Sequence, residues 1–208
     1  MIVTIYFFLI TKYLSYVVPL IVIWRKKIRG KIISLLSLFL LTSLIFSLTG
    51  RIFAIEKGSA VPIYHVAIFI RYIFFLLILN DIRNKPRLFW ICLSLASCLF
   101  YFESIYQNGW WVNNELMTNF SNVSLTAIAI PYLYMITNQI NTEFSKFNFY
   151  LISSILVYNG SFLILSLFET GIAQKQSFAN FFLIVYYNFI EIVLNLGITY
   201  SLWKLREA

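Results

Sequence analysis

Residues 178–203 read FANFFLIVYYNFIEIVLNLGITYSLW, and Glu191 is the one charged residue in this stretch. An α-helix needs about 20 apolar residues to cross the roughly 30 Å of hydrocarbon in a lipid bilayer. The stretch is longer than that. Its apolar residues are continuous, whereas they would alternate with polar ones in a barrel strand of about 10 residues. The stretch therefore predicts a transmembrane helix.

Six more apolar runs of similar length precede this one. The seven runs cover, in order, residues 2–24, 32–50, 61–80, 88–107, 118–137, 147–168 and 178–203. The chain is 61% hydrophobic and 12% charged, whereas a soluble domain is about a quarter charged. Helices and closed barrels are the structures that satisfy every backbone polar group in lipid. The sequence predicts an all-α polytopic membrane protein, a single domain of seven transmembrane helices over residues 1–208.

The basic residues are sorted onto one side of these runs. Most of the 16 Lys and Arg residues follow runs one, three, five and seven. They are Arg25, Lys26, Lys27, Arg29, Lys31, Arg83, Lys85, Arg87, Lys146, Lys204 and Arg206. Because positively charged loops stay in the cytoplasm, we expect the N-terminus outside, the C-terminus inside, and a multi-pass protein of the inner (plasma) membrane. This distribution explains the net charge of +8 and argues against a nucleic-acid partner.

The tryptophans give an independent indication of the same topology. Trp24, Trp90 and Trp203 fall at cytoplasmic ends of runs, and Trp110 and Trp111 fall in the outer loop after run four. Indole rings prefer the level of the lipid headgroups. Their positions therefore agree with the predicted run ends.

The first cytoplasmic loop holds the densest group of charges. It contains Arg25, Lys26, Lys27, Arg29 and Lys31. The loop is expected to set the orientation and to contact anionic headgroups of the bilayer, with each cation contributing about 1 kcal/mol. The alternative is a docking site for a cytoplasmic or membrane protein partner.

Three charged residues interrupt the apolar runs at nearly one depth. Lys12, Arg71 and Glu191 lie nine to twelve residues from the inner ends of their runs, which places them within roughly 5 Å of each other in depth. A charge at the bilayer centre costs about 2.5–3.5 kcal/mol even on the lenient insertion scale. We therefore expect an interior ion pair at Glu191, and the sequence leaves open which cation makes it.

Further polar residues accompany this cluster. Asn188, Glu191 and Asn195 share one face of the last helix because they are spaced i, i+3 and i+7. The other polar candidates within the runs are Tyr64, His65, Glu103, Asn122 and Asn159. Together these residues predict a polar interior. It is either a hydrogen-bonded core that fixes helix register or a site for a ligand or ion.

The sequence offers no set of catalytic residues. Its single histidine excludes zinc sites built on paired histidines. Its single aspartate, Asp81, falls in a cytoplasmic loop, which excludes a pair of intramembrane aspartates. No GxSxG or P-loop motif occurs. We therefore expect no enzymatic activity, no metal and no cofactor.

Short loops separate the runs, so consecutive helices are expected to be antiparallel neighbours. Pro19 and Pro131 lie at similar distances from the ends of runs one and five. These two helices would cross the membrane in the same direction. The chain is therefore compatible with a parallel 3+1+3 repeat.

Three features of the chain support a resemblance: Tyr64-His65 at the start of run three, the basic loop after Trp24, and the ending Asn188-x6-Asn195-x7-Trp203. In these features the chain resembles a group of small seven-helix bacterial inner-membrane proteins. In that group a carboxylate commonly stands at the position of Arg71, so this chain departs from the pattern there. The resemblance implies the seven-helix fold and no established activity.

The size and topology are also similar to those of seven-helix transporters of the PQ-loop and sugar-exporter type. The Pro-Gln pair of that class is absent, because Leu20 follows Pro19 and Tyr132 follows Pro131. The sequence is thus compatible with two functions. The first is a non-enzymatic membrane component that senses a ligand or organises a partner through its polar interior. The second is a transporter of small solutes or anions with a midplane site in a 3+1+3 repeat.

Overall fold

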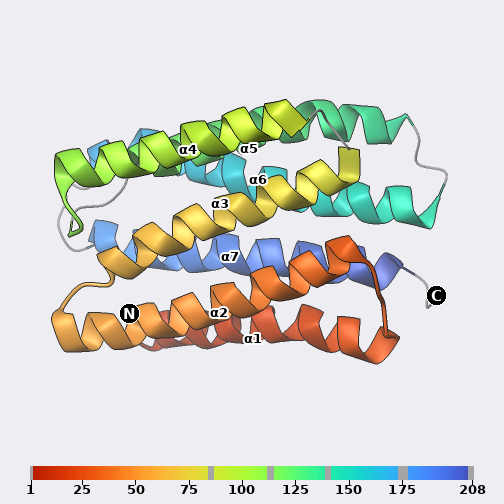
Figure 1. Ribbon diagram of the computed structural model, residues 1–208. Coiled ribbons are helices and arrows are strands. Elements are labelled where there is room, and N and C mark those ends of the chain that lie inside the picture. Colours follow the sequence, from red (N-terminus) through yellow and green to blue (C-terminus); the bar gives the residue numbers. More distant parts are fainter. Residues whose placement is uncertain (1, 84–86, 112–114, 139–141, 173–177, 206–208) are drawn as a thin grey trace. The chain divides into compact units, whose positions relative to one another are not determined.

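The computed structural model describes residues 2–83, 87–111, 115–138, 142–172 and 178–205. Within these ranges the protein is all-α and forms seven helices (Figure 1). They are α1 (Ile2–Lys26), α2 (Lys31–Lys57), α3 (Val61–Arg83), α4 (Arg87–Asn108), α5 (Glu115–Thr137), α6 (Glu143–Ile172) and α7 (Phe178–Lys204). All seven are long and apolar enough to cross a membrane. The prediction of an all-α chain with seven membrane-compatible helices is confirmed.

The helices overlap the predicted runs and several extend beyond them. The second run was expected to end at residue 50, but α2 continues through Arg51 to Lys57. Polar residues end an apolar run but not the helix itself, because helical turns that face water can contain polar side chains. The helix stops at Gly58, whose φ of 78° favours glycine and whose N–H donates to the Ala54 carbonyl over 3.0 Å.

The chain divides into two compact units. The first contains Met1–Ile28 and Thr126–Ala208, and the second contains Arg29–Leu125. The first unit therefore holds α1, α6, α7 and the C-terminal part of α5. The second holds α2, α3, α4 and the remainder of α5. The single-domain description stays a prediction.

In the first unit, α7 packs against both α1 and α6. The contacts between α1 and α7 join Lys12 to Glu191, Ser15 to Asn195 and Lys26 to Trp203. Residue numbers increase together along both helices, so α1 and α7 are parallel. This direction is expected, because the chain reverses its direction after each crossing of a membrane and six reversals separate α1 from α7.

The helices α6 and α7 approach closely at a glycine. A Cβ atom added to Gly197 would lie 2.0 Å from Ser154 Oγ and 2.7 Å from Ser154 Cβ. Further along the same interface, Tyr150 meets Tyr200 edge to face, with ring centroids 4.8 Å apart. Small residues let helix backbones approach in this way. Gly197 therefore sets the spacing of α6 and α7.

In the second unit, α2 and α3 form an antiparallel pair. Phe39 of α2 lies with its ring centroid 5.1 Å from that of Phe75 in α3, and both side chains are fully buried. At one end of the pair, Lys31 forms a salt bridge with Asp81. These contacts agree with the expectation that helices joined by a short loop are antiparallel neighbours.

Aromatic side chains connect α3, α4 and α5 within the second unit. Phe69 lies 4.8 Å from Tyr101 between ring centroids, and Phe100 lies 4.4 Å from Phe120. Tyr72 of α3 is fully buried against Phe120 and accepts a hydrogen bond from Ser124 at 3.2 Å. Aromatic contacts therefore join these three helices.

Candidate functional site

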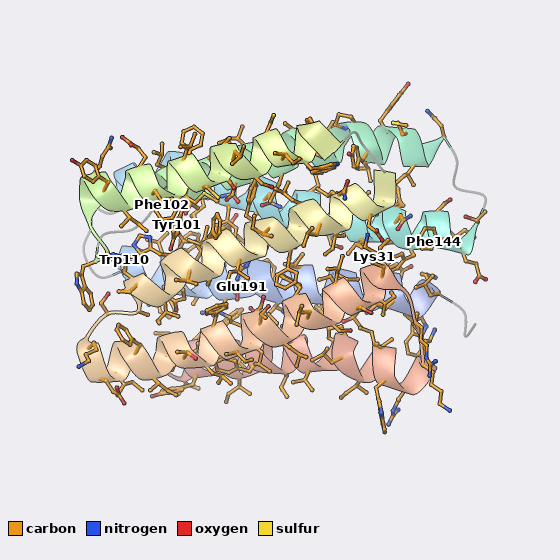
Figure 2. The ribbon with its side chains drawn as sticks, in the orientation of Figure 1. Lys31, Tyr101, Phe102, Trp110, Phe144 and Glu191 are labelled. Atoms are coloured by element: carbon orange, nitrogen blue, oxygen red, sulfur yellow. The ribbon has the colours of Figure 1, made fainter. Side chains whose placement is uncertain are left out.

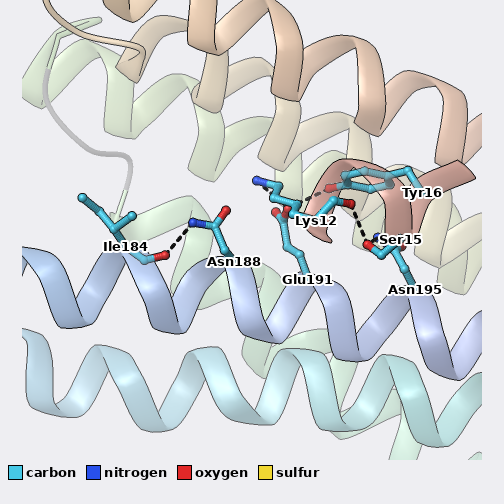
Figure 3. Close-up of polar contacts among 7 residues, drawn as sticks. All are labelled: Lys12, Ser15, Tyr16, Ile184, Asn188, Glu191 and Asn195. Carbon is cyan, nitrogen blue, oxygen red and sulfur yellow. Dashed lines mark hydrogen bonds and ion pairs between the residues drawn. The ribbon is translucent and has the colours of Figure 1, made fainter. Parts of the chain in front are cut away.

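A buried ion pair joins the first and last helices of the chain. Lys12 Nζ of α1 lies 2.7 Å from Glu191 Oε2 of α7 (Figure 3), and their side chains are 11% and 13% exposed. Glu191 lies midway along α7 (Figure 2). The structure therefore identifies Lys12 as a cation that pairs with Glu191, a choice that the sequence had left open.

A second donor reaches the same carboxylate oxygen. Tyr16 Oη donates to Glu191 Oε2 over 2.7 Å, and the Tyr16 side chain is buried (Figure 3). Lys12 and Tyr16 are four residues apart, so one face of α1 presents both groups to α7. A buried charge pair is stabilised when further hydrogen bonds satisfy its lone pairs. The Tyr16 hydroxyl supplies such a bond.

A third contact follows one turn further along the same seam. Asn195 Nδ2 of α7 donates to Ser15 Oγ over 2.9 Å, and Ser15 Oγ donates to the Lys12 carbonyl over 2.7 Å. Asn195 is fully buried, and its Oδ1 atom has no hydrogen-bond partner among the described residues. The seam therefore retains one unused buried acceptor beside the ion pair.

Asn188 completes the polar face of α7. It is buried, and its Nδ2 atom donates to the Ile184 carbonyl one turn earlier, over 2.7 Å (Figure 3). Asn188, Glu191 and Asn195 thus lie on the α7 face predicted from their spacing. We name the α1 and α7 residues Lys12, Ser15, Tyr16, Asn188, Glu191 and Asn195 the polar seam.

The other predicted polar residues do not all belong to this seam. In the first unit, Asn159 of α6 is buried and donates to the Ile155 carbonyl over 2.7 Å. Tyr64, His65, Arg71, Glu103 and Asn122 lie in the second unit. The predicted polar interior is therefore divided between the two units.

The second-unit candidates have different environments. Tyr64 and Glu103 are exposed, and Glu103 accepts a hydrogen bond from Gln107 Nε2 at 2.5 Å. His65 is buried and lies edge-on to Trp110, with ring centroids 6.0 Å apart.

Two further candidates in this unit lie in α3 and α5. Arg71 of α3 is half-buried. Asn122 of α5 is buried, and its Nδ2 atom has no hydrogen-bond partner among the described residues.

The basic loop also divides into two kinds of residue. Lys26 Nζ donates to the Trp203 and Leu205 carbonyls over 2.9 and 2.8 Å, and Lys31 pairs with Asp81. These two lysines contact other residues of the chain, although the Lys31 side chain is itself exposed. The remaining three, Arg25, Lys27 and Arg29, are exposed.

Two seam residues were not predicted from the sequence, namely Ser15 and Tyr16. Their spacing could have indicated them, because they lie three and four residues after Lys12 and so share its helical face. Serine and tyrosine are ordinary residues in membrane helices. Their role becomes visible when α7 is known to lie against that face of α1.

The chemistry of the seam is that of charge and hydrogen bonding. It contains an ammonium group, a carboxylate, a phenol, a hydroxyl and two amides. Within the described residues, no group of three or more His, Cys, Asp or Glu side chains could hold a metal ion. The seam can fix the register of α1 on α7, exchange a proton at Glu191, or bind a small polar ligand.

Comparison of the chain with models of protein families, with curated proteins and with solved structures finds no match. The class of the protein therefore rests on its sequence and structure alone. Its seven described helices, all long and apolar enough to cross a membrane, indicate a multi-pass membrane protein.

Proposed function

We propose that this chain is a non-enzymatic protein of the inner (plasma) membrane that senses a ligand or organises a partner. Its N-terminus lies outside and its C-terminus in the cytoplasm. The observation that carries the proposal is the Lys12–Glu191 ion pair with its second donor, Tyr16. Ionisable groups inside a membrane protein are costly and commonly functional.

The same two helices connect the ion pair to the basic end of the protein. They run in parallel, and Lys26 links the end of α1 to the end of α7. The exposed cations Arg25 and Lys27 lie at that end. A change in the ion pair that shifts α1 against α7 would therefore change the surface that these cations present.

Parallel packing also supports the proposed topology. Both α1 and α7 have basic residues in their last turns, Arg25 and Lys26 in one and Lys204 in the other. The parallel arrangement brings these cationic ends to the same side. Cytoplasmic membrane ends carry such an excess of positive charge.

The transporter alternative uses the same midplane ion pair. Its 3+1+3 repeat requires the first three helices to form one group that superposes on the last three. The compact units follow a different division, because α1 belongs with α6 and α7. We therefore rank the transporter second.

The proposal is tested by recovering the partner from native membranes. The tagged full chain is crosslinked, solubilised in a mild detergent and purified, and the associated proteins are quantified by mass spectrometry. We expect one stoichiometric partner, and neutralising Arg25, Lys27 and Arg29 to Gln should lower its recovery. The matched control, Arg51→Gln with Lys57→Gln, changes exposed cations of α2 and should leave recovery unchanged.

The sensory part of the proposal needs a second variant. Glu191→Gln leaves the basic loop intact and removes the ion pair, so it should also change partner recovery. Recovery of a clean monomer from wild-type membranes, or equal recovery from all variants, would contradict the proposed function.

A further inference from the structure

The ends of α1 and α7 meet at a side chain that acts on both helices. Lys26 Nζ donates to two carbonyls at the end of α7, those of Trp203 and Leu205, and lies 5.1 Å from the centroid of the Trp203 ring. The last carbonyls of a helix have no partner within the helix. Lys26 therefore satisfies two of them from the neighbouring helix.

This contact changes the electrostatics of the helix ends. The C-terminus of a helix carries a partial negative charge, which would repel an anion. At α7 the ammonium group of Lys26 lies against the carbonyls that carry this charge. Lys26 therefore offsets this partial charge at the end of α7. The neighbouring described cations Arg25, Lys27 and Lys204 add to the positive charge there.

Three exposed cations surround the linked ends. Arg25 and Lys27 come from the end of α1, and Lys204 comes from the end of α7. Lys204 Nζ lies 5.0 Å from the centroid of the Tyr200 ring, a distance at which a cation is attracted to the ring face. The contact keeps this flexible cation near the helix end.

One acidic residue, Glu143, lies toward this end of α6. Glu143 is seven residues before the Tyr150 that meets Tyr200, and Lys204 is four residues after Tyr200. Because α6 and α7 are antiparallel, Glu143 and Lys204 differ by only about 5 Å in level along the helices. Among the described residues of the first unit at this end, the one carboxylate, Glu143, is outnumbered by five cations, Arg25, Lys26, Lys27, Lys146 and Lys204. The charge of these residues is therefore predominantly positive.

Two exposed tryptophans flank the cations. Trp24 is 79% exposed and Trp203 is 63% exposed. An indole ring has an apolar body and one N–H donor, and it prefers the boundary between acyl chains and headgroups. Two such rings beside three cations fit a lipid, which offers both an acyl chain and a phosphate.

We propose that the linked ends of α1 and α7, comprising Trp24, Arg25, Lys27, Trp203 and Lys204, bind the phosphate headgroup of an anionic membrane lipid. Arg25, Lys27 and Lys204 hold the phosphate, and the two indole rings contact the glycerol and the upper acyl chain. Lys26 organises the site from within. The site lies within the first unit and shares Arg25 and Lys27 with the surface proposed for the protein partner. It is therefore tested on the purified chain without any partner, so that its failure is distinct from failure of the proposed function.

The test is a lipid titration of the purified, delipidated full chain by native mass spectrometry. The probes are phosphatidylglycerol and phosphatidylcholine with identical acyl chains. We expect the first phosphatidylglycerol to bind about tenfold more tightly than phosphatidylcholine. Arg25→Gln with Lys204→Gln should abolish that difference, and the control Arg51→Gln with Lys57→Gln should retain it.

Three results would contradict the proposed lipid site. Equal binding of the two lipids would show that the headgroup is not recognised. An equal loss in both double variants would show general electrostatic attraction instead of a site. Displacement of the lipid by millimolar inorganic phosphate would show a site for free anions.

A single variant guards against misfolding of the double variant. Lys27→Gln removes one exposed cation and should give an intermediate loss of the preference for phosphatidylglycerol.

Discussion

Lys12 Nζ and Glu191 Oε2 lie 2.7 Å apart although their helices are the first and last of the seven. The pair is held in register by Ser15 with Asn195 on one side and by Tyr16 at the carboxylate itself. Because α1 and α7 are parallel, this single seam fixes the longitudinal position of one helix against the other. The polar seam therefore determines the register of α1 against α7 in the first unit.

The Tyr16 hydroxyl is predicted to strengthen the ion pair. Tyr16→Phe removes one donor to Glu191 and leaves the ring in place, so the free energy of unfolding should fall by about 1.5–3 kcal/mol, as for a hydrogen bond to a charged group. Reversible unfolding in mixed micelles measures the change. Tyr6→Phe is the matched control, since Tyr6 is exposed on the same helix. Equal stability of the two variants would contradict the role of Tyr16.

The close approach at Gly197 is predicted to be intolerant of a methyl group. In Gly197→Ala the new Cβ would meet both Ser154 Oγ and Ser154 Cβ, and rotation of the hydroxyl relieves only the first contact. The helices must therefore separate, at a cost of about 1–3 kcal/mol. Thermal melts in detergent check this.

Gly160 provides the control for that substitution. A Cβ at Gly160 would meet nothing within 4 Å. Gly160→Ala should therefore leave the melting temperature unchanged or raise it, because alanine favours the helix. Equal melting temperatures of the two variants would contradict the steric role of the contact between Gly197 and Ser154.

Lys26 is predicted to protect the end of α7. Lys26→Met keeps the apolar stem and removes the donor to the Trp203 and Leu205 carbonyls. The last turn of α7 should then fray, and its amide hydrogen exchange should accelerate about tenfold. Lys27→Met changes an exposed neighbour and should leave exchange in α7 unaltered.

The proposed topology predicts which loops can be labelled from outside. In a background with Cys92→Ser and Cys98→Ser, a cysteine at position 57 should react with a membrane-impermeant maleimide on intact cells. A cysteine at position 29 should react only after the cells are opened. The reverse pattern would place the N-terminus in the cytoplasm and would contradict the proposed orientation.

Much of the fold was predictable because lipid imposes strict requirements. Continuous apolar runs of about 20 residues have few structural alternatives, and the described helices overlap all seven runs. The distance of Lys12 and Glu191 to their run ends predicted that they share one level, and their ion pair agrees with this. The spacing of Asn188, Glu191 and Asn195 correctly placed them on one face.

The partner of Glu191 was not predictable from the same reasoning. Short loops predict which consecutive helices are neighbours, such as α2 with α3 and α6 with α7. They say nothing about α1 and α7, which are separated by most of the chain. Ser15 and Tyr16 were missed for this reason, and so was the contact of Lys26 with the end of α7.

The most direct test is a double-mutant cycle on Lys12→Met and Glu191→Gln, measured as free energies of unfolding in mixed micelles. Each single variant removes one member of the ion pair and should cost about 3–5 kcal/mol, whereas the double variant should be more stable than either. We therefore predict a coupling energy of about 2 kcal/mol or more. Additivity within about 0.5 kcal/mol would show that the two side chains do not interact, and would contradict the ion pair as the centre of the site.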